Sequence, residues 1–339
     1  MVLVDFSSFL DLPRYGITIP SHDSRKTKTL EALKSHPDLS RRIPEWCIEG
    51  FGDLLSLEDL LLVHGKSYAG GFFNENARQR IISAFELVNE DGSFNRWVPD
   101  NATEPLPAML PQLIKMVTGP YSAGKIALES GYCHYLGGGT HHGHRDFGHG
   151  FCPFNDSALA MRKLMKEKRI KRGWIIDTDA HKGDGTAAIF ANDSSVATLS
   201  IHMASGWPLD GSLPPGHPSY TPSTYDIPIE SGEEHTYLER LEASLKKLKA
   251  SHSADFAVVL AGADPWEEDE LESTSLLNLT QQQLLERDQL VYNFLQAAGL
   301  PSVWLTAGGY GQGAWKIYAS FLNWVLVKRL GGAGVTGRR

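Results

Sequence analysis

Carboxylates and an imidazole cluster directly after one apolar segment of the chain. Residues 172–176 are mostly apolar and include β-branched side chains, which predicts a buried strand. Asp177, Asp179 and His181 follow this strand. Asp184 comes three residues later, between two glycines. Alternation along an extended chain places Asp177 and Asp179 on one face, with His181 beside them. Carboxylate oxygens and an imidazole nitrogen that converge in this way suit a divalent metal ion, with zinc as the first choice.

A histidine-rich loop follows a second predicted strand, at residues 131–136. The loop holds four histidines within nine positions, and two of them, His141 and His142, are adjacent. Adjacent side chains cannot both face the core from one strand, so at least one ring is predicted to point into a cavity. On its own, such a loop would also be compatible with an ordinary surface loop. The other two histidines are His144 and His149.

Two further predicted strands are followed by groups that could take part in hydrolysis. A strand at 256–261 ends close to Asp264, and a strand at 301–306 precedes Tyr310, which lies between glycines. Each residue alone is also compatible with a helix cap or an ordinary turn. The carboxyl ends of the strands form the usual ligand-binding edge of an open α/β sheet. We therefore expect the four segments to form one site.

The combined residues could hydrolyse an amide. Asp179, His181 and Asp264 would supply three metal ligands and leave one coordination position open, as catalytic zinc requires. Zinc would lower the pKa of a water molecule toward neutrality. The adjacent histidines could take up its proton, with the other two aspartates of the first segment orienting their rings. Tyr310 could donate a hydrogen bond to a developing oxyanion.

Predicted strands and helices alternate along most of the chain. A further strand is predicted at 196–202, and apolar residues recur at helical spacing between the strands. This alternation predicts an α/β fold with a central, mostly parallel sheet and helices on both faces. The predicted helices are 76–88, 123–129, 157–168, 234–249, 280–298 and 314–327.

The sequence predicts one domain. No internal repeat, low-complexity linker or shift in composition divides it, so residues 1–330 are predicted to form a single catalytic domain. Residues 331–339 are glycine-rich and are predicted to be a flexible tail. Residues 105–117 contain prolines that predict turns. The polar residues 16–42 could be surface, or a loop that reaches over the site.

Charge and composition limit the partners and the compartment. The net charge of −8 among 339 residues argues against an extensive basic surface, so direct binding of nucleic acid is not expected. No uninterrupted apolar stretch is long enough to cross a membrane. The three cysteines lack C-x-x-C spacing, which indicates a reducing compartment, and the first residues lack the features of a signal peptide. We therefore expect a cytoplasmic protein; the sequence does not indicate its oligomeric state.

These motifs occur together in the order typical of one enzyme family. From about residue 60 to residue 327 the chain resembles the zinc-dependent histone deacetylases, and it looks most like their class IV and bacterial deacetylase-like members. The resemblance implies the arginase/deacetylase fold and hydrolysis of the amide bond of Nε-acyl-lysine in proteins or peptides. The motifs are Leu62-Val63-His64, Gly138-Gly139-Thr140-His141-His142, Gly150-Phe151-Cys152-Pro153-Phe154-Asn155-Asp156, residues 177–185, Gly262-Ala263-Asp264 and Gly308-Gly309-Tyr310.

The resemblance also implies a role for each site residue. His142, partnered by Asp184, would act as general base and then as general acid. His141, partnered by Asp177, would mainly tune the electrostatics of the site. Tyr310 would polarise the scissile carbonyl, and Ala307 replaces a glycine that the family has in the run before it. The implied zinc ligands are Asp179, His181 and Asp264.

Two kinds of binding site are implied in addition to the zinc site. A structural potassium ion is implied near the end of the first strand, and a second, more loosely matched one would involve Phe190 and Val196. The resemblance places Gly150 and Phe151 in the wall of an acyl-lysine tunnel. Trp207 would form the facing wall, where many members carry two phenylalanines. The residues implied for the first potassium ion are Asp177, Asp179, His181, Ser200 and Ile201.

Two other functions stay open. The same groups could hydrolyse acetylpolyamines or other small amides. Polyamine-selective relatives carry an acidic residue at the position of Leu271, so a leucine there favours lysine, although Glu270 would supply the acidic group if the loop is shifted. Residues 267–270 are all acidic and either form a solvated loop or attract a basic peptide or polyamine. A protein that only binds acyl-lysine would be expected to lack some proton-transfer groups, all of which are present.

Overall fold

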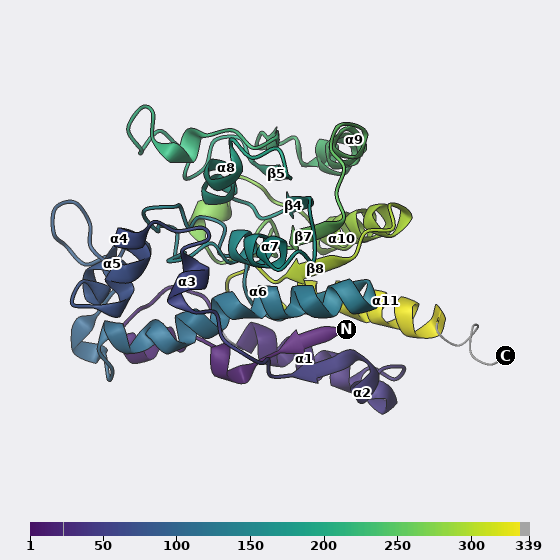
Figure 1. The fold of residues 1–339 in the computed structure, drawn as a ribbon, viewed down its shortest axis with the longest axis horizontal. Coiled ribbons are helices and arrows are strands. Elements are labelled where there is room, and N and C mark those ends of the chain that lie inside the picture. Colours follow the sequence, from purple (N-terminus) through teal and green to yellow (C-terminus); the bar gives the residue numbers. More distant parts are fainter. Residues whose placement is uncertain (23, 333–339) are drawn as a thin grey trace.

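Eight parallel strands form one sheet through the centre of the protein (Figure 1). The computed structural model describes residues 1–22 and 24–332. The strands lie in the order β2-β1-β3-β8-β7-β4-β5-β6, and each neighbouring pair is parallel. The α/β fold is therefore confirmed, with a sheet that is parallel throughout. The strands are β1 Val2–Val4, β2 Cys47–Glu49, β3 Tyr132–Tyr135, β4 Gly173–Asp177, β5 Val196–Met203, β6 Tyr225–Ile229, β7 Phe256–Leu260 and β8 Ser302–Leu305.

Helices cover the sheet and connect its strands. The later helices lie close to their predicted positions, because their apolar periodicity and their end signals agree. Helix α10, for example, starts after Thr280, whose hydroxyl and backbone form a capping box with Gln283. The helices are α1 Ser24–Ser35, α2 Ile43–Trp46, α3 Leu57–Leu60, α4 Lys66–Gly70, α5 Ala77–Ala84, α6 Leu110–Ser130, α7 Asp156–Lys166, α8 Asp184–Phe190, α9 Tyr237–Ser251, α10 Gln281–Ala297 and α11 Trp315–Gly332.

The sheet separates two apolar cores. Successive side chains of β4 point to opposite faces: Ile175 packs into one core, and Trp174 and Ile176 pack into the other. Helices α6 and α7 supply apolar side chains to the first core, whereas α1, α9, α10 and α11 supply the second. Both faces of the central strands are thus buried, which explains why these strands read as continuous apolar runs rather than as alternating ones.

The predictions for residues 105–130 were wrong in one respect. The predicted turns and the short helix at 123–129 are replaced, from Leu110 onward, by one helix of 21 residues, α6, with Pro120 inside it. Packing compensates for the proline, because α6 lies against α7 and β3. A Cβ atom at Gly119 would come 2.1 Å from the ring of Tyr135, so glycine allows this close approach.

Several short elements near the sheet edges were not predicted. Strands β1 and β2 have three residues each, too few for a periodic pattern, and β6 contains Pro228. Helix α1 lies within the polar segment 16–42 and packs against α11. The predicted flexible tail starts at residue 331. Helix α11 continues through Gly332, and residues 333–339 lie outside the described part of the chain.

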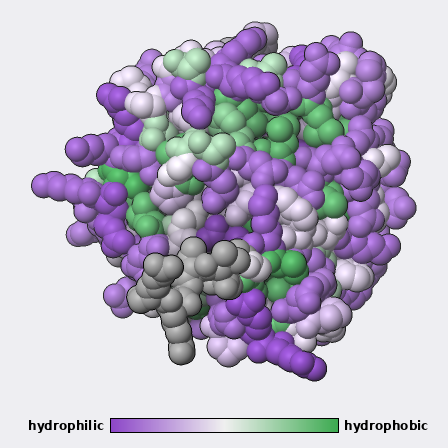
Figure 2. Space-filling model, turned by 90° about the vertical axis from the view of Figure 1, so that its right-hand side faces the viewer, coloured by the Kyte–Doolittle hydropathy of each residue, from purple (hydrophilic) through white to green (hydrophobic). Residues whose placement is uncertain are grey.

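The surface mixes hydrophilic and apolar side chains. Figure 2 shows one face of the molecule, on which hydrophilic side chains surround several separate apolar patches. Scattered apolar residues of this kind are normal on a folded protein. Within residues 1–22 and 24–332, no helix has both the length and the apolar content needed to cross a membrane.

Candidate active site

Four neighbouring strands carry the candidate site. Strands β3, β8, β7 and β4 lie side by side in the sheet, and because they are parallel their carboxyl ends share one edge. His141 and His142 follow β3, and Tyr310 follows β8. Asp264 follows β7, and Asp177 is the last residue of β4. The structure thus brings together at one edge the four segments that the sequence singled out.

Two carboxylates and one imidazole form what we call the acidic cluster: Asp179, His181 and Asp264. Their possible ligand atoms lie within 4.8 Å of one another, and all three residues are buried. The Nδ1 atom of His181 lies 3.4 Å from an oxygen of each carboxylate. Its Nε2 atom lies 3.1 Å from the hydroxyl of Ser273, which can hold the proton on Nε2 and leave Nδ1 free.

The acidic cluster has more negative charge than its hydrogen bonds can compensate. Burial and the neighbouring Asp179 raise the pKa of Asp264 to about 8. Burial acts in the same direction on Asp179, but His141 and His181 hold its pKa well below the usual value. Atom Oδ2 of Asp264 is buried and has no hydrogen-bond partner. A cation would compensate this charge, and the donor set of two carboxylates and one imidazole fits zinc.

A glycine loop closes over the acidic cluster. The backbone N–H of Gly308 donates to Oδ2 of Asp179 over 2.9 Å. A Cβ atom at Gly308 would come 2.4 Å from Oδ2 of Asp264, so only glycine lets the loop pass this closely. Ala307, which departs from the family's glycine, has a φ of 52°, in the left-handed region that favours glycine.

Each of the adjacent histidines has its own carboxylate. The Nδ1 atom of His141 lies 2.6 Å from Asp177, and the Nδ1 atom of His142 lies 2.6 Å from Asp184. Burial alone would lower the pKa of both imidazoles. For His141, the carboxylates of Asp177 and Asp179 outweigh burial and raise the pKa to about 10. For His142, burial and the neighbouring His141 lower the pKa to about 3, so its ring is neutral near pH 7.

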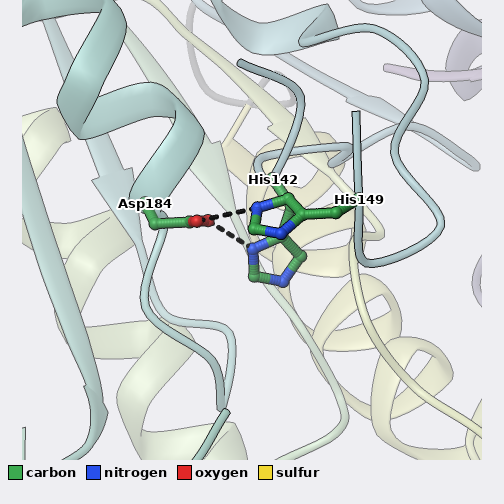
Figure 3. Close-up of side chains that lie close together, drawn as sticks. All are labelled: His142, His149 and Asp184. Atoms are coloured by element: carbon green, nitrogen blue, oxygen red, sulfur yellow. Dashed lines mark hydrogen bonds and ion pairs between the residues drawn. The ribbon is translucent and has the colours of Figure 1, made fainter. Parts of the chain in front are cut away.

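Asp184 belongs to a second group, which we call the Asp184 cluster: Asp184, His142, His144 and His149. Figure 3 shows the rings of His142 and His149 directed at the same carboxylate. Oxygen Oδ2 of Asp184 lies 3.0 Å from Nε2 of His144 and 2.9 Å from Nε2 of His149. The sequence shows these last two histidines in the loop but indicates no role for them. The only available signal was their density in the loop.

A cavity opens in front of the two clusters. Gly150, Phe151, Trp207 and Leu271, the residues assigned to the substrate tunnel by resemblance, all line it. A Cβ atom at Gly150 would come 2.5 Å from the Trp207 ring, so the absence of a side chain at Gly150 allows the indole to pack against its backbone. The wall also includes His142 of the Asp184 cluster, His181 of the acidic cluster, and Tyr310.

Two charged residues of this cavity were missed by the sequence analysis. Glu86 and Arg96 have positive φ angles of 54° and 51°, which no sequence pattern indicates for these residue types. Glu86 accepts a hydrogen bond from the backbone N–H of Gly150 over 3.2 Å. The guanidinium of Arg96 lies 5.8 Å from the ring centre of Phe151. The predicted helix 76–88 ends earlier, at Ala84, because the chain turns here toward the cavity.

A second cavity adjoins the first and shares His142, His181 and Tyr310 with it. Apolar residues line it together with Arg25, at the start of α1. The guanidinium of Arg25 donates to the backbone carbonyl of Gly309, next to Tyr310. Part of the segment 16–42 therefore does reach the site, which was one of the two possibilities considered for it. The apolar lining residues include Leu10, Leu12, Ile19, Phe85 and Met116.

The acidic run 267–270 divides into two parts. Asp269 accepts a hydrogen bond from the backbone N–H of Tyr310 over 2.7 Å, and Glu270 accepts one from the backbone N–H of Gln312 over 2.9 Å. These two carboxylates therefore support the loop that carries Tyr310. Glu267 and Glu268 are exposed. Glu270 is exposed as well, so only Asp269 of this run is partly buried.

The first implied potassium site shares Asp179 and His181 with the acidic cluster, whereas Val196 of the second pairs with Gly173 at the opposite end of β4. Ser200 on β5 pairs with Asp177 on β4, and its hydroxyl accepts a hydrogen bond from the N–H of Gly183 over 3.2 Å. Ile201 follows in β5 and is buried. Phe190 ends α8. Neither potassium site is tested by these contacts, and both stay predictions.

Similarity to known proteins agrees with the fold. Residues 19–323 match the family model of the histone deacetylase domain. The chain therefore belongs to the histone deacetylase family, and its all-parallel sheet is the arginase/deacetylase fold expected from the resemblance. Membership of this family supports a deacetylase, a hydrolase that acts on acetylated substrates.

Relatives come from bacteria and a plant. The chain is 30% identical to an uncharacterized protein of Picosynechococcus sp. over 287 residues, 82% of this chain and 91% of the relative. It is 27% identical to histone deacetylase 2 of Arabidopsis thaliana over 78% of this chain, and 28% identical to the acetoin utilization protein AcuC of Bacillus subtilis over 78% of this chain. The matches span 64% and 66% of these two proteins, respectively.

Proposed function

We propose that the protein is a zinc-dependent hydrolase that cleaves the amide bond of Nε-acyl-lysine in proteins or peptides. One carboxylate oxygen of Asp264 accepts no hydrogen bond within a buried group of two carboxylates and one imidazole, and this is the observation that carries the proposal. Asp179, His181 and Asp264 would hold the zinc ion. A bound zinc ion would supply Lewis-acid chemistry for amide hydrolysis.

The surrounding residues would take up the proton of the attacking water molecule and stabilise the negative charge that develops on the carbonyl oxygen. His142 is neutral near pH 7, and its Nδ1 atom faces Asp184, so Nε2 is available as a base. After the proton is taken up, the same nitrogen can donate it to the leaving amine. His141, held by Asp177, would tune the local charge. Burial and the nearby Asp264 and Asp179 raise the pKa of Tyr310 well above its usual value, so its hydroxyl keeps the proton that it would donate to the carbonyl oxygen.

The cavity suits a long, mainly apolar side chain. Phe151, Trp207 and Leu271 would bury the aliphatic stem of an acyl-lysine. Leu271 offers no charge to a polyamine, and Arg96 in the same cavity would repel one. Glu86 is the observation that keeps acetylpolyamine hydrolysis as the second candidate, although its carboxylate already accepts a hydrogen bond from Gly150.

A parallel assay tests the proposal. Purified protein, stripped of metal and then reloaded with zinc, is given acyl-lysine peptides of different acyl length and acetylpolyamines. We expect hydrolysis of the peptides by the zinc-loaded protein and a loss of hydrolysis after metal removal. Full activity of metal-free protein would contradict the zinc mechanism. If only acetylpolyamines are hydrolysed, the substrate is a polyamine and not an acyl-lysine. If no amide is hydrolysed, the protein only binds acyl-lysine.

A further inference from the structure

We propose that His144 and His149 are positioning residues that act on His142 through the shared carboxylate of Asp184. This inference rests on the proposed function, in which His142 is the proton acceptor. It assigns a use to two histidines that neither bind the proposed zinc ion nor touch the reacting atoms. Both belong to the same loop as His142, and all three rings meet at one side chain. Figure 3 shows two of them, His142 and His149, with Asp184.

The hydrogen bonds fix the carboxylate on both of its oxygens. Oδ1 of Asp184 lies 2.6 Å from Nδ1 of His142. Oδ2 lies 3.0 Å from Nε2 of His144 and 2.9 Å from Nε2 of His149. An ionised carboxylate only accepts hydrogen bonds, so each of these nitrogens must carry a proton. Asp184 is ionised, because the charge interaction with His142 and the hydrogen bonds from the three histidines outweigh burial and hold its pKa well below the usual value.

Packing holds the two added rings in place. The ring of His144 stacks on Phe147, with ring centres 4.2 Å apart and an interplanar angle of 12°. The ring of His149 meets Trp207 edge-on, with ring centres 4.9 Å apart. Both imidazoles are buried. They therefore have little freedom to turn away, and the Asp184 carboxylate keeps one orientation.

A fixed carboxylate fixes the tautomer of His142. With its proton held on Nδ1 by Asp184, His142 presents the bare Nε2 nitrogen that the proposed reaction needs. If Oδ2 lost its two donors, the carboxylate could rotate, and its contact with Nδ1 of His142 would weaken. His141 differs, because its carboxylate, Asp177, is held instead by the backbone N–H of Asp179 over 3.1 Å.

The spacing of this group would also permit a metal ion. His142, His149 and Asp184 place possible ligand atoms within 4.8 Å of one another. However, both oxygens of Asp184 already accept hydrogen bonds, whereas Asp264 in the acidic cluster has an unpaired buried oxygen. Hydrogen bonding thus satisfies the Asp184 cluster without a cation. The experiment below also tests whether a second metal ion binds at the Asp184 cluster.

The experiment compares two replacements at each position. Gln retains an N–H donor near the place of Nε2, and Met has a similar size without a donor. We expect H149M and H144M to lower kcat on an acyl-lysine peptide by about 10- to 100-fold, with KM and zinc content unchanged. H149Q and H144Q should recover most of the lost kcat. H217M is the matched control, because the ring of His217 lies near His149 but makes no hydrogen bond to Asp184.

A second readout does not depend on turnover. The ¹⁵N shifts of the His142 ring report which nitrogen carries the proton. We expect the proton on Nδ1 in the wild-type protein and in H149Q, and a mixture of tautomers in H149M. Equal kcat in the Met and Gln variants, with an unchanged tautomer, would overturn the inference. A second equivalent of zinc in the wild-type protein, lost in H149M, would overturn it in favour of a metal site. A wild-type protein that hydrolyses no acyl-lysine contradicts the proposed function, and the tautomer measurement then decides the inference separately.

Discussion

The acidic cluster and the Asp184 cluster contain the same two residue types in different proportions. Asp179 and Asp264 share a single imidazole, His181, and one of their oxygens lacks a partner. Asp184 is surrounded by three imidazoles, and both of its oxygens accept hydrogen bonds. Both groups are buried at the same edge of the sheet. Residue types and spacing alone would make each of them a candidate metal site.

The difference lies in how each buried carboxylate is compensated. A buried charge must be neutralised or fully hydrogen-bonded, because it has lost its water. In the Asp184 cluster, N–H donors of the three histidines form hydrogen bonds to both carboxylate oxygens. In the acidic cluster the donors are too few, and a metal ion would supply the missing positive charge. The count of donors around each carboxylate therefore separates a metal site from a hydrogen-bonded network more clearly than composition does.

The largest effect is expected from removing the negative charge of Asp264, one of whose oxygens accepts no hydrogen bond. D264N should abolish zinc retention and lower kcat/KM by about 10³-fold or more, because Lewis-acid catalysis contributes several kcal/mol. D184N should also lose activity but should retain zinc, since Asp184 belongs to the other cluster. Metal analysis after dialysis, together with peptide hydrolysis, checks both variants. Zinc loss in D184N and retention in D264N would reverse the assignment of the two clusters.

The next effect concerns Tyr310, which lines the same cavity as His142 and His181. Y310F should lower kcat by about 10²- to 10³-fold, as expected for the loss of one hydrogen-bond donor to an oxyanion, without loss of zinc. Y220F is the control, because the Tyr220 hydroxyl donates to the backbone carbonyl of Leu213 outside the site. Steady-state kinetics and metal analysis provide the measurement. Unchanged kcat in Y310F would remove Tyr310 from the proposed mechanism.

A smaller effect is expected from the hydroxyl beside His181. S273A should weaken zinc binding by about 10- to 100-fold, because Nε2 of His181 loses its partner and the ring is less well oriented. S275A, on the same loop but without this contact, should bind zinc like the wild-type protein. Competition with a chelator of known affinity measures the difference. Equal affinity in S273A would show that the acidic cluster does not need this orientation.

The smallest effect extends the comparison to a buried imidazole that has no carboxylate at all. Neither ring nitrogen of His134 has a hydrogen-bond partner, and burial lowers the pKa of this residue to about 3. Above about pH 6.5 the ring is neutral in both states, so its full contribution to stability is present. As the pH falls from there toward 3, only the unfolded state takes up the proton. The free energy of unfolding should then decrease by up to about 1.4 kcal/mol per pH unit.

Urea denaturation at several pH values measures this dependence. H134L should show a flatter loss of stability between pH 7 and pH 5 than the wild-type protein. H235L changes an exposed histidine and should leave the slope unaltered. The same slope in H134L and the wild-type protein would mean that His134 does not contribute to the acid sensitivity of the fold.

The sequence by itself determined the inner strands β3, β4, β5, β7 and β8 and the chemistry that follows them. Apolar β-branched runs such as 172–176 are buried on both faces, so they are recognisable without knowledge of the fold. Parallel strands place their carboxyl ends together, which is why residues as distant as Asp177 and Tyr310 could be assigned to one edge. The family resemblance and its residue roles depended on the same segments.

Only the tertiary structure decided the strand order and the partners of each group. The sequence order of β3, β4, β7 and β8 differs from their order in the sheet, because long-range pairing has no local signal. Packing against α7 made α6 continuous through Pro120. Contacts from distant loops brought Arg25, Glu86 and Arg96 to the cavities. Distances of a few ångströms decide which histidines share Asp184 and which carboxylate oxygen accepts no hydrogen bond. Residue types and spacing do not encode these distances.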